Sequence, residues 1–358
     1  MLNIDEYSKL SKFKPVSVSP AIQIFKVYKV KPKSNVLIWC DLGKNKNNIS
    51  ARLGKTFYNF FKKKKCNVSI VVGKYISKPH LANEKINTAV FSLSKKDLFI
   101  SMGSGQALYF HKNGFRIITR DLIKKQKFNM VATNGLISVK ENNVSRFIKA
   151  YSPNLKFIQK IGEKLKKKFK NTKKVKITCP LGSNLEFELV KNREVINNYG
   201  NIKRDTNYPV GEVYTAPREG TAQGIVYIKS SKVLGETILH NKAVKYIFKN
   251  GVLVDSSFKK FNNALTQLEE FNFKKKIKSP YKKVRNLAEF AIGTNKNAKF
   301  IGVMINDEKI FGTAHIGIGA NKHFGGKINC FGHQDQVIEN PTIYFDNKKI
   351  LENGKFLI

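Results

Sequence analysis

The sequence has little cysteine, no long apolar run and few acidic residues, and the first two shortages each argue against a class of protein. Its four cysteines lie far apart and form no C-x-x-C pair, which argues against a finger-type zinc site and a disulfide framework. No apolar run approaches the roughly 18 residues that a membrane span needs, and residues 1–14 lack the apolar core of a signal peptide. We therefore expect a cytoplasmic protein without a membrane partner.

Acidic residues number 25 against 66 lysines and arginines, giving a formal net charge of +41 at pH 7. Such an excess is typical of nucleic-acid-binding proteins. Here lysine is spread over the whole chain, and the densest basic run, 163–176, lies among apolar residues at helical spacing, Ile161, Leu165 and Phe169. That pattern predicts an amphipathic helix with a solvated lysine face. We expect no specific nucleic-acid partner.

The 358 residues suffice for about two domains, and the pattern of the sequence changes near residue 174. In the first part, short apolar strands alternate with amphipathic helices such as 49–65. The strands are expected at 34–43, 66–73, 97–105 and 115–120. Strand–helix alternation predicts an N-terminal α/β domain with a parallel sheet over residues 1–173.

The second part is dominated by strands and turns. Residues 174–190 predict a β-hairpin with PLGSN as its turn, and the turn residues KNG and DNKK separate later strands. One helix is expected at 262–276. The predicted fold class is therefore α/β, with the parallel-sheet domain followed by a mixed, mainly antiparallel α+β domain over 174–358.

The ionisable residues best suited to a site lie in this second domain, in four short patches set among glycines and apolar residues. The patches are PVGEVYTAPREGTAQG (Glu212), NLAEFAIGTN (Glu289), GTAHIGIGAN (His315) and HQD (His333 and Asp335). In a strand, His333 and Asp335 project from one face because a single residue separates them. Histidines and carboxylates together are the ligands of zinc, cobalt, manganese or iron. Taken singly, each is equally a buried histidine or a solvated carboxylate, so spacing alone leaves both interpretations open.

The order of these patches resembles the aminopeptidase T family of metallopeptidases. The resemblance rests on GEV..AP.EG.A.G, LAEFAIGTN, GTAHIGIGAN..FGG, the H-x-D pair and PTIYFD, and covers residues 174–358. It implies a dinuclear leucyl aminopeptidase and a homodimer, with two divalent ions (Zn, Co or Mn) held by two glutamates, two histidines and an aspartate. By motif, these ligands are Glu212, Glu289, His315, His333 and Asp335.

The resemblance also implies a reaction, the removal of the N-terminal residue from a peptide. Glu212 is expected to act as the general base, with Glu219 as the alternative. Arg218 and Lys322 are expected to bind the substrate. One departure concerns Lys322, since family peptidases carry a tyrosine at that position, seven residues after the first ligand histidine; here His323 follows it.

A second family shares part of the pattern and leaves an alternative open. The 2,5-dihydroxypyridine 5,6-dioxygenases also have a HIGxG segment, a glycine pair and an H-x-D pair, and they hold one Fe(II). Its ligands here would be His315, His333 and Asp335. That group lacks the glutamates found here at 212 and 289, which favours two metal ions. A third interpretation is a non-catalytic descendant that uses the same scaffold for binding.

Overall fold

The chain folds into two compact units. The computed structural model describes residues 3–44, 48–75, 80–105, 108–113, 115–117, 119–200, 205–274 and 281–358. Unit 1 comprises Met1–Ser152 and Gly200–Val210, and unit 2 comprises Pro153–Tyr199 and Gly211–Ile358. Within the described residues, no helix is both long and apolar enough to cross a membrane.

The boundary between the units lies before helix α6 (Leu155–Lys170), whereas the sequence placed it at 173/174. Asn154 caps this helix by accepting a hydrogen bond from the backbone N–H of Phe157. Leu165 and Phe169 on its apolar face pack into the core of unit 2. The amphipathic helix is confirmed, but it ends at Lys170 and its buried stripe belongs to the second sheet.

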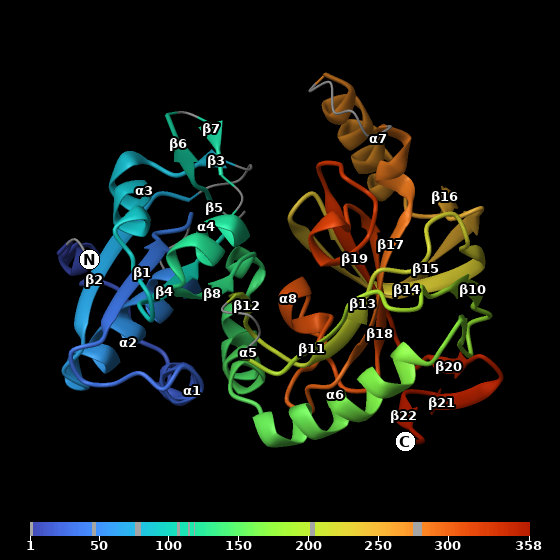
Figure 1. Ribbon diagram of the computed structural model, residues 1–358, viewed down its shortest axis with the longest axis horizontal. Coiled ribbons are helices and arrows are strands. Elements are labelled where there is room, and N and C mark those ends of the chain that lie inside the picture. Colours follow the sequence, from blue (N-terminus) through green and yellow to red (C-terminus); the bar gives the residue numbers. More distant parts are fainter. Residues whose placement is uncertain are drawn as a thin grey trace. The chain divides into compact units, whose positions relative to one another are not determined.

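Unit 1 is built on a five-stranded parallel sheet, labelled in Figure 1. Its strands, in spatial order, are β12 (Asp205–Asn207), β8 (Asn129–Thr133), β4 (Leu98–Met102), β1 (Asn35–Asp41) and β2 (Asn67–Gly73). Its helices are α1 (Ser19–Val27), α2 (Ile49–Lys63), α3 (Glu84–Phe91), α4 (Thr119–Gln126) and α5 (Val144–Tyr151), with 3-10 turns η1 (Tyr7–Leu10), η2 (Leu136–Ser138) and η3 (Glu141–Asn143). Two small sheets pair β3 (His80–Leu81) with β5 (Leu108–Tyr109), and β6 (His111–Lys112) with β7 (Phe115–Arg116).

Helices cover both faces of the unit 1 sheet, as buried parallel strands require. Leu37 and Trp39 of β1 lie in one core cluster with residues of α3 and α4. The alternate residue Cys40 faces α2, so closely that a Cβ on Gly54 would lie 2.5 Å from its Sγ atom. The predicted parallel-sheet α/β domain is confirmed.

One predicted strand in unit 1 is wrong. Residues 115–120 form only the two-residue strand β7, and helix α4 begins at Thr119; residue 118 lies outside the described residues. A short apolar run does not distinguish a strand from the start of a helix. Here Leu122 and Ile123 bury the helix against the sheet, and the strand that joins this sheet is β8, which was not predicted.

Unit 2 is built on a 13-stranded sheet whose described pairings are all antiparallel. The main path runs through β11 (Val195–Asn198), β13 (Glu212–Thr215), β17 (Leu287–Gly293), β18 (Ala314–Gly319), β19 (His333–Ile338), β14 (Gln223–Val233), β10 (Asn184–Glu188), β9 (Lys174–Thr178), β20 (Thr342–Phe345), β21 (Lys348–Glu352) and β22 (Lys355–Phe356). Two further strands, β15 (Glu236–Lys249) and β16 (Val252–Ser256), extend from β14. The hairpins predicted at 174–190, at KNG and at DNKK are all present.

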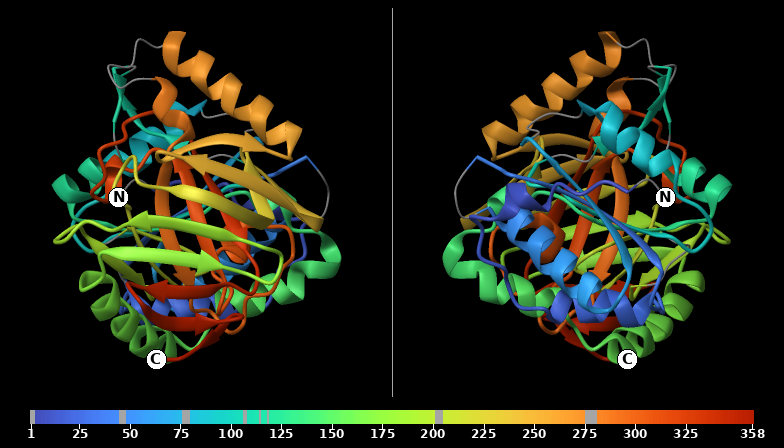
Figure 2. Two further views of the ribbon diagram at one scale, coloured as in Figure 1. Left: turned by 90° about the vertical axis from the view of Figure 1, so that its right-hand side faces the viewer. Right: turned by 90° about the vertical axis from the view of Figure 1, so that its left-hand side faces the viewer.

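Helices α6 and α7 (Lys259–Lys274) lie at opposite ends of unit 2 in Figures 1 and 2, α7 in orange. The remaining short elements are α8 (Met304–Asp307), η4 (Tyr281–Arg285) and η5 (Lys322–Phe324).

The side chains of strand β18 alternate between the two faces of the sheet. Ile316 and Ile318 point into the core that α6 and α7 help to form, so His315 and Gly317 project from the opposite face.

Candidate metal centre

The five residues expected as metal ligands lie on four neighbouring strands of unit 2. Glu212 begins β13, Glu289 lies in β17, His315 in β18, and His333 and Asp335 in β19. The order β13-β17-β18-β19 is continuous in the sheet. Ladder hydrogen bonds between adjacent strands therefore fix the spacing of these side chains.

Gly317 forms the floor of this cluster. It pairs across the ladder with Glu289 on one side and Asp335 on the other. A Cβ at this position would lie 2.6 Å from Cε1 of His333 and 2.8 Å from Cβ of Glu289. Only a residue without a side chain leaves room here for both neighbours.

The strand that carries Glu289 contains an irregularity just before it. The β17–β18 register shifts between Leu287 and Glu289, so Ala288 has no direct partner on β18. A bulge of this kind re-aims the side chains that follow it. Glu289 thereby faces the cluster, where its side chain is about nine-tenths buried.

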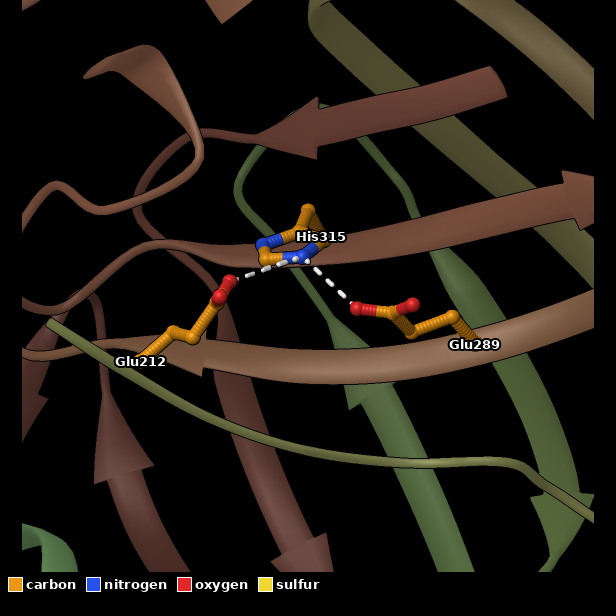
Figure 3. Close-up of side chains that lie close together, drawn as sticks. All are labelled: Glu212, Glu289 and His315. Carbon is orange, nitrogen blue, oxygen red and sulfur yellow. Dashed lines mark hydrogen bonds and ion pairs between the residues drawn. The ribbon is translucent and has the colours of Figure 1, made fainter. Parts of the chain in front are cut away.

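Two groups of side chains meet at Glu289. On one side, Nε2 of His315 lies 3.3 Å from Oε1 of Glu289 and 3.5 Å from Oε2 of Glu212 (Figure 3). On the other side, Nε2 of His333 lies 3.2 Å from Oε2 of Glu289 and 2.9 Å from Oδ1 of Asp335. Each oxygen of Glu289 thus faces a different histidine.

Contacts outside the cluster hold these ligands in orientation. The Nδ1–H of His333 donates to the carbonyl of Ala320 at 2.7 Å, which directs Nε2 toward the carboxylates. The ammonium of Lys232 donates to Oδ2 of Asp335 at 3.0 Å, leaving Oδ1 toward His333. Such outer partners fix the tautomer and the direction of metal ligands.

The structure adds two residues that sequence reasoning missed, Glu308 and Lys309. They follow α8, and a carboxylate oxygen of Glu308 lies within 4.8 Å of ligand atoms of His315 and Asp335. The fully buried Lys309 ammonium contacts Glu212 at 2.6 Å and Glu308 at 2.5 Å. A lysine is rarely buried without such partners. The sequence signal was the acidic and basic pair "EK" shortly before GTAH, which looks like a pair of surface charges.

The segment that presents Glu308 and Lys309 is anchored by the buried carboxylate of Asp307. It accepts hydrogen bonds from the backbone N–H groups of Ile301 and Gly302 and from the hydroxyl of Ser230. Burial raises the pKa of Asp307 despite these hydrogen bonds. The short helix α8 is therefore tied to the sheet at the point where it delivers two charged side chains to the cluster.

The charges of the cluster shift the pKa values of its histidines and of Asp335. Burial would lower the pKa of His315, but Glu289, Glu212 and Glu308 raise it to about 9. Against the same effect of burial, Asp335 and Glu289 raise the pKa of His333 well above its ordinary value. Burial opposes ionisation of Asp335, yet Lys232 and His333 hold its pKa well below the usual range. Without metal, both side chains are therefore imidazolium cations at neutral pH, with a proton on each ring nitrogen.

The donor atoms fit divalent metal ions. Ligand atoms about 2.1 Å from one tetrahedral ion lie roughly 3.4 Å from each other. The gaps from His315 to Glu289 and to Glu212, 3.3 and 3.5 Å, match this spacing and are long for hydrogen bonds. Three trios of donors lie within 4.8 Å of one another: Glu212–Glu289–His315, Glu289–His333–Asp335 and Glu308–His315–Asp335.

We expect Zn²⁺ to bind the metal-free protein more weakly as the pH falls below about 9. The reason is that the ion must displace the protons on His315 and His333, whose pKa values are raised. Calorimetric titration in two buffers of different ionisation enthalpy measures the protons released, and repeating it at several pH values gives the affinity trend. An affinity that is constant between about pH 6 and pH 9 would contradict the assignment of histidine ligands.

The other residues named from the sequence lie outside this cluster. Arg218 is about half exposed and pairs with Glu188 at 3.0 Å. Glu219 pairs with Arg193 and accepts a hydrogen bond from the backbone N–H of Lys327, so it serves as a loop anchor. Lys322 is exposed on η5. It is the neighbouring His323 whose ring lies beside His333.

Two solved structures are similar to this chain over almost its whole length. The structure of 2,5-dihydroxypyridine dioxygenase from Pseudomonas putida KT2440 matches 96% of this chain and 98% of its own, with a TM-score of 0.68 and 15% identity. Wild-type AmpT from Thermus thermophilus matches 95% of this chain and 99% of its own, with a TM-score of 0.62 and 14% identity. At these identities the likeness shows a shared fold. No curated protein matches the sequence significantly.

One family model matches the sequence. The model for thermophilic metalloproteases (M29) matches residues 138–329, just over half of the sequence. The matched segment includes Glu212, Glu289 and His315, and it ends before His333 and Asp335. The chain therefore belongs to the M29 family of thermophilic metalloproteases.

Proposed function

We propose that this chain is an aminopeptidase that removes N-terminal residues from peptides with two divalent metal ions, Zn, Co or Mn. The observation that carries the proposal is the position of Glu289, which belongs to two of the donor trios and offers a different oxygen to each. One ion would be held by Glu212, Glu289 and His315, and the other by Glu289, His333 and Asp335. When bound, such ions lower the pKa of water and polarise a carbonyl group.

The residues of the chain supply the proton acceptor. Glu212 was expected in this role, but one of its oxygens accepts a hydrogen bond from Lys309 and the other faces His315. Burial and the charges of Asp335 and Glu212 outweigh Lys309 and raise the pKa of Glu308 to about 7. We therefore assign to Glu308 the transfer of a proton from the attacking water, because it can take up and release one near neutral pH.

The alternative of a single Fe(II) has less support from the geometry. Its ligands would be His315, His333 and Asp335, and none of the donor trios found among the described residues contains both histidines. The two imidazoles instead face different oxygens of Glu289. The homodimer, the cytoplasmic location and the absence of a specific nucleic-acid partner stay predictions.

Metal analysis of protein purified without chelator tests this proposal. We expect about two ions of zinc, cobalt or manganese per chain, and release of leucine from a leucyl peptide that is lost on chelation and restored by the metal. The same peptide with an acetylated amino terminus is the control, and it should not be cleaved. One iron per chain, with oxygen consumption on 2,5-dihydroxypyridine, would replace the peptidase by the dioxygenase.

A further inference from the structure

Solvent reaches the metal cluster from one side. The side chains of His315 and Lys309 are only 1% exposed, whereas those of His333 and Lys232 are 20% and 32% exposed. Both exposed side chains contact Asp335. A substrate must therefore approach the cluster past His333 and Lys232.

His323 lies on this open side. Its exposed imidazole has its ring centre 6.0 Å from that of His333, with the two planes at 78°. The buried ring of Phe324 packs edge-on against both imidazoles, at 4.6 Å from His323 and 5.9 Å from His333. Phe324 thus sets the spacing of the two histidines.

The loop that carries His323 is fixed to the sheet. The buried side chain of Asn321 donates to the carbonyl of Ala288 at 3.2 Å and accepts from the N–H of Ile328 at 2.8 Å. The loop also passes so close to this amide that a Cβ on Gly326 would lie 2.0 Å from it. Ala288 directly precedes the candidate ligand Glu289, so the loop that carries His323 is attached to the same strand as this ligand.

We propose that His323 is a catalytic residue of the metal site, whose imidazole N–H donates a hydrogen bond to the carbonyl oxygen of the peptide bond being cleaved. This inference rests on the proposed peptidase function. It depends on the exposure of His323, its position beside the most exposed ligand histidine and its fixed loop. A donor held in place before the reaction stabilises the negative charge that develops on that oxygen.

The test compares His323→Ala and His323→Gln, since glutamine keeps an N–H donor of similar reach. In the metal-loaded enzyme we expect His323→Ala to lower kcat by about 100-fold with KM changed only a few-fold, and His323→Gln to recover about tenfold of that loss. Metal content should be unchanged in both variants. Lys327→Ala, an exposed side chain of the same loop, is the matched control and should behave as wild type.

The outcomes separate this inference from the proposed function. If wild type cleaves the peptide and His323→Ala retains its kcat, the inference fails and the peptidase stands. If His323→Ala loses metal together with activity, His323 is a ligand and the inference also fails. If metal-loaded wild type cleaves no peptide, the proposed function fails and the inference with it. Melting temperatures of the two variants, expected to equal that of wild type, show that the fold is retained.

Discussion

Replacing Glu289 by Gln is expected to abolish peptide hydrolysis and to release both metal ions. Glu289 offers Oε1 to the trio with Glu212 and His315, and Oε2 to the trio with His333 and Asp335. An amide binds divalent ions more weakly than a carboxylate and cannot bridge two of them with negative charge. Activity should fall by at least about 1,000-fold, because the metals supply several kcal/mol of transition-state stabilisation. Metal content after gel filtration and kcat/KM are the two measurements.

Asp335→Asn is the matched comparison for Glu289→Gln. Only Oδ1 of Asp335 faces a ligand histidine, His333, because Oδ2 pairs with the ammonium of Lys232. We expect this variant to keep about one ion per chain, in the trio that Asp335 does not join. Equal metal loss in the two variants would show that Glu289 does not contribute to both metal sites. Full retention of metal by Glu289→Gln would remove the basis of the dinuclear proposal.

The substitution Gly317→Ala should damage the site with a single methyl group. The new Cβ would lie 2.6 Å from Cε1 of His333 and 2.8 Å from Cβ of Glu289, so at least one of these side chains must move. We expect metal binding to weaken by about 10- to 100-fold, as when the support of a metal ligand is disturbed. The overpacking should also destabilise unit 2 by about 1–3 kcal/mol. Calorimetric titration with Zn²⁺ and denaturant unfolding measure the two effects.

Gly182→Ala serves as the control for this methyl group. Gly182 lies in the turn between β9 and β10 with φ of +95°, and an added Cβ would meet only Tyr227, at an ordinary 3.8 Å. This variant should lose about 1 kcal/mol through backbone strain and bind metal as wild type does. If Gly317→Ala binds metal as well as Gly182→Ala does, the glycine is not part of the site.

The sequence allowed good predictions where the pattern is local. Alternation along β19 placed His333 and Asp335 on one face, and the structure puts the amides of Gln334 and Gln336 on the other, bonded to the N–H of Leu234 and the hydroxyl of Tyr246. The hairpins followed from their turn residues in the same way. Period-two alternation and turn chemistry depend on near neighbours, so one sequence is enough to detect them.

Features that depend on distant partners were not predictable. The sequence shows that α6 has an apolar face but not which sheet that face meets, so the predicted boundary fell on the wrong side of the helix. Glu308 and Lys309 look like surface charges in NDEKIF, and their burial becomes clear only when Glu212, far away in the sequence, lies beside them. A charged side chain is buried only where an oppositely charged partner compensates it, and the local sequence does not contain that partner.

The alternation on β19 also has a consequence for how the protein folds. A slip of one residue in the pairing of β19 with β18 would turn His333 and Asp335 to the opposite face and bring Gln334 and Gln336 toward the cluster. Metal ions bind a chain only where their ligands are assembled, so they stabilise the correctly paired sheet and not the slipped one. In this fold, the ions that we propose for catalysis would therefore also favour the native alignment of the strands that hold them.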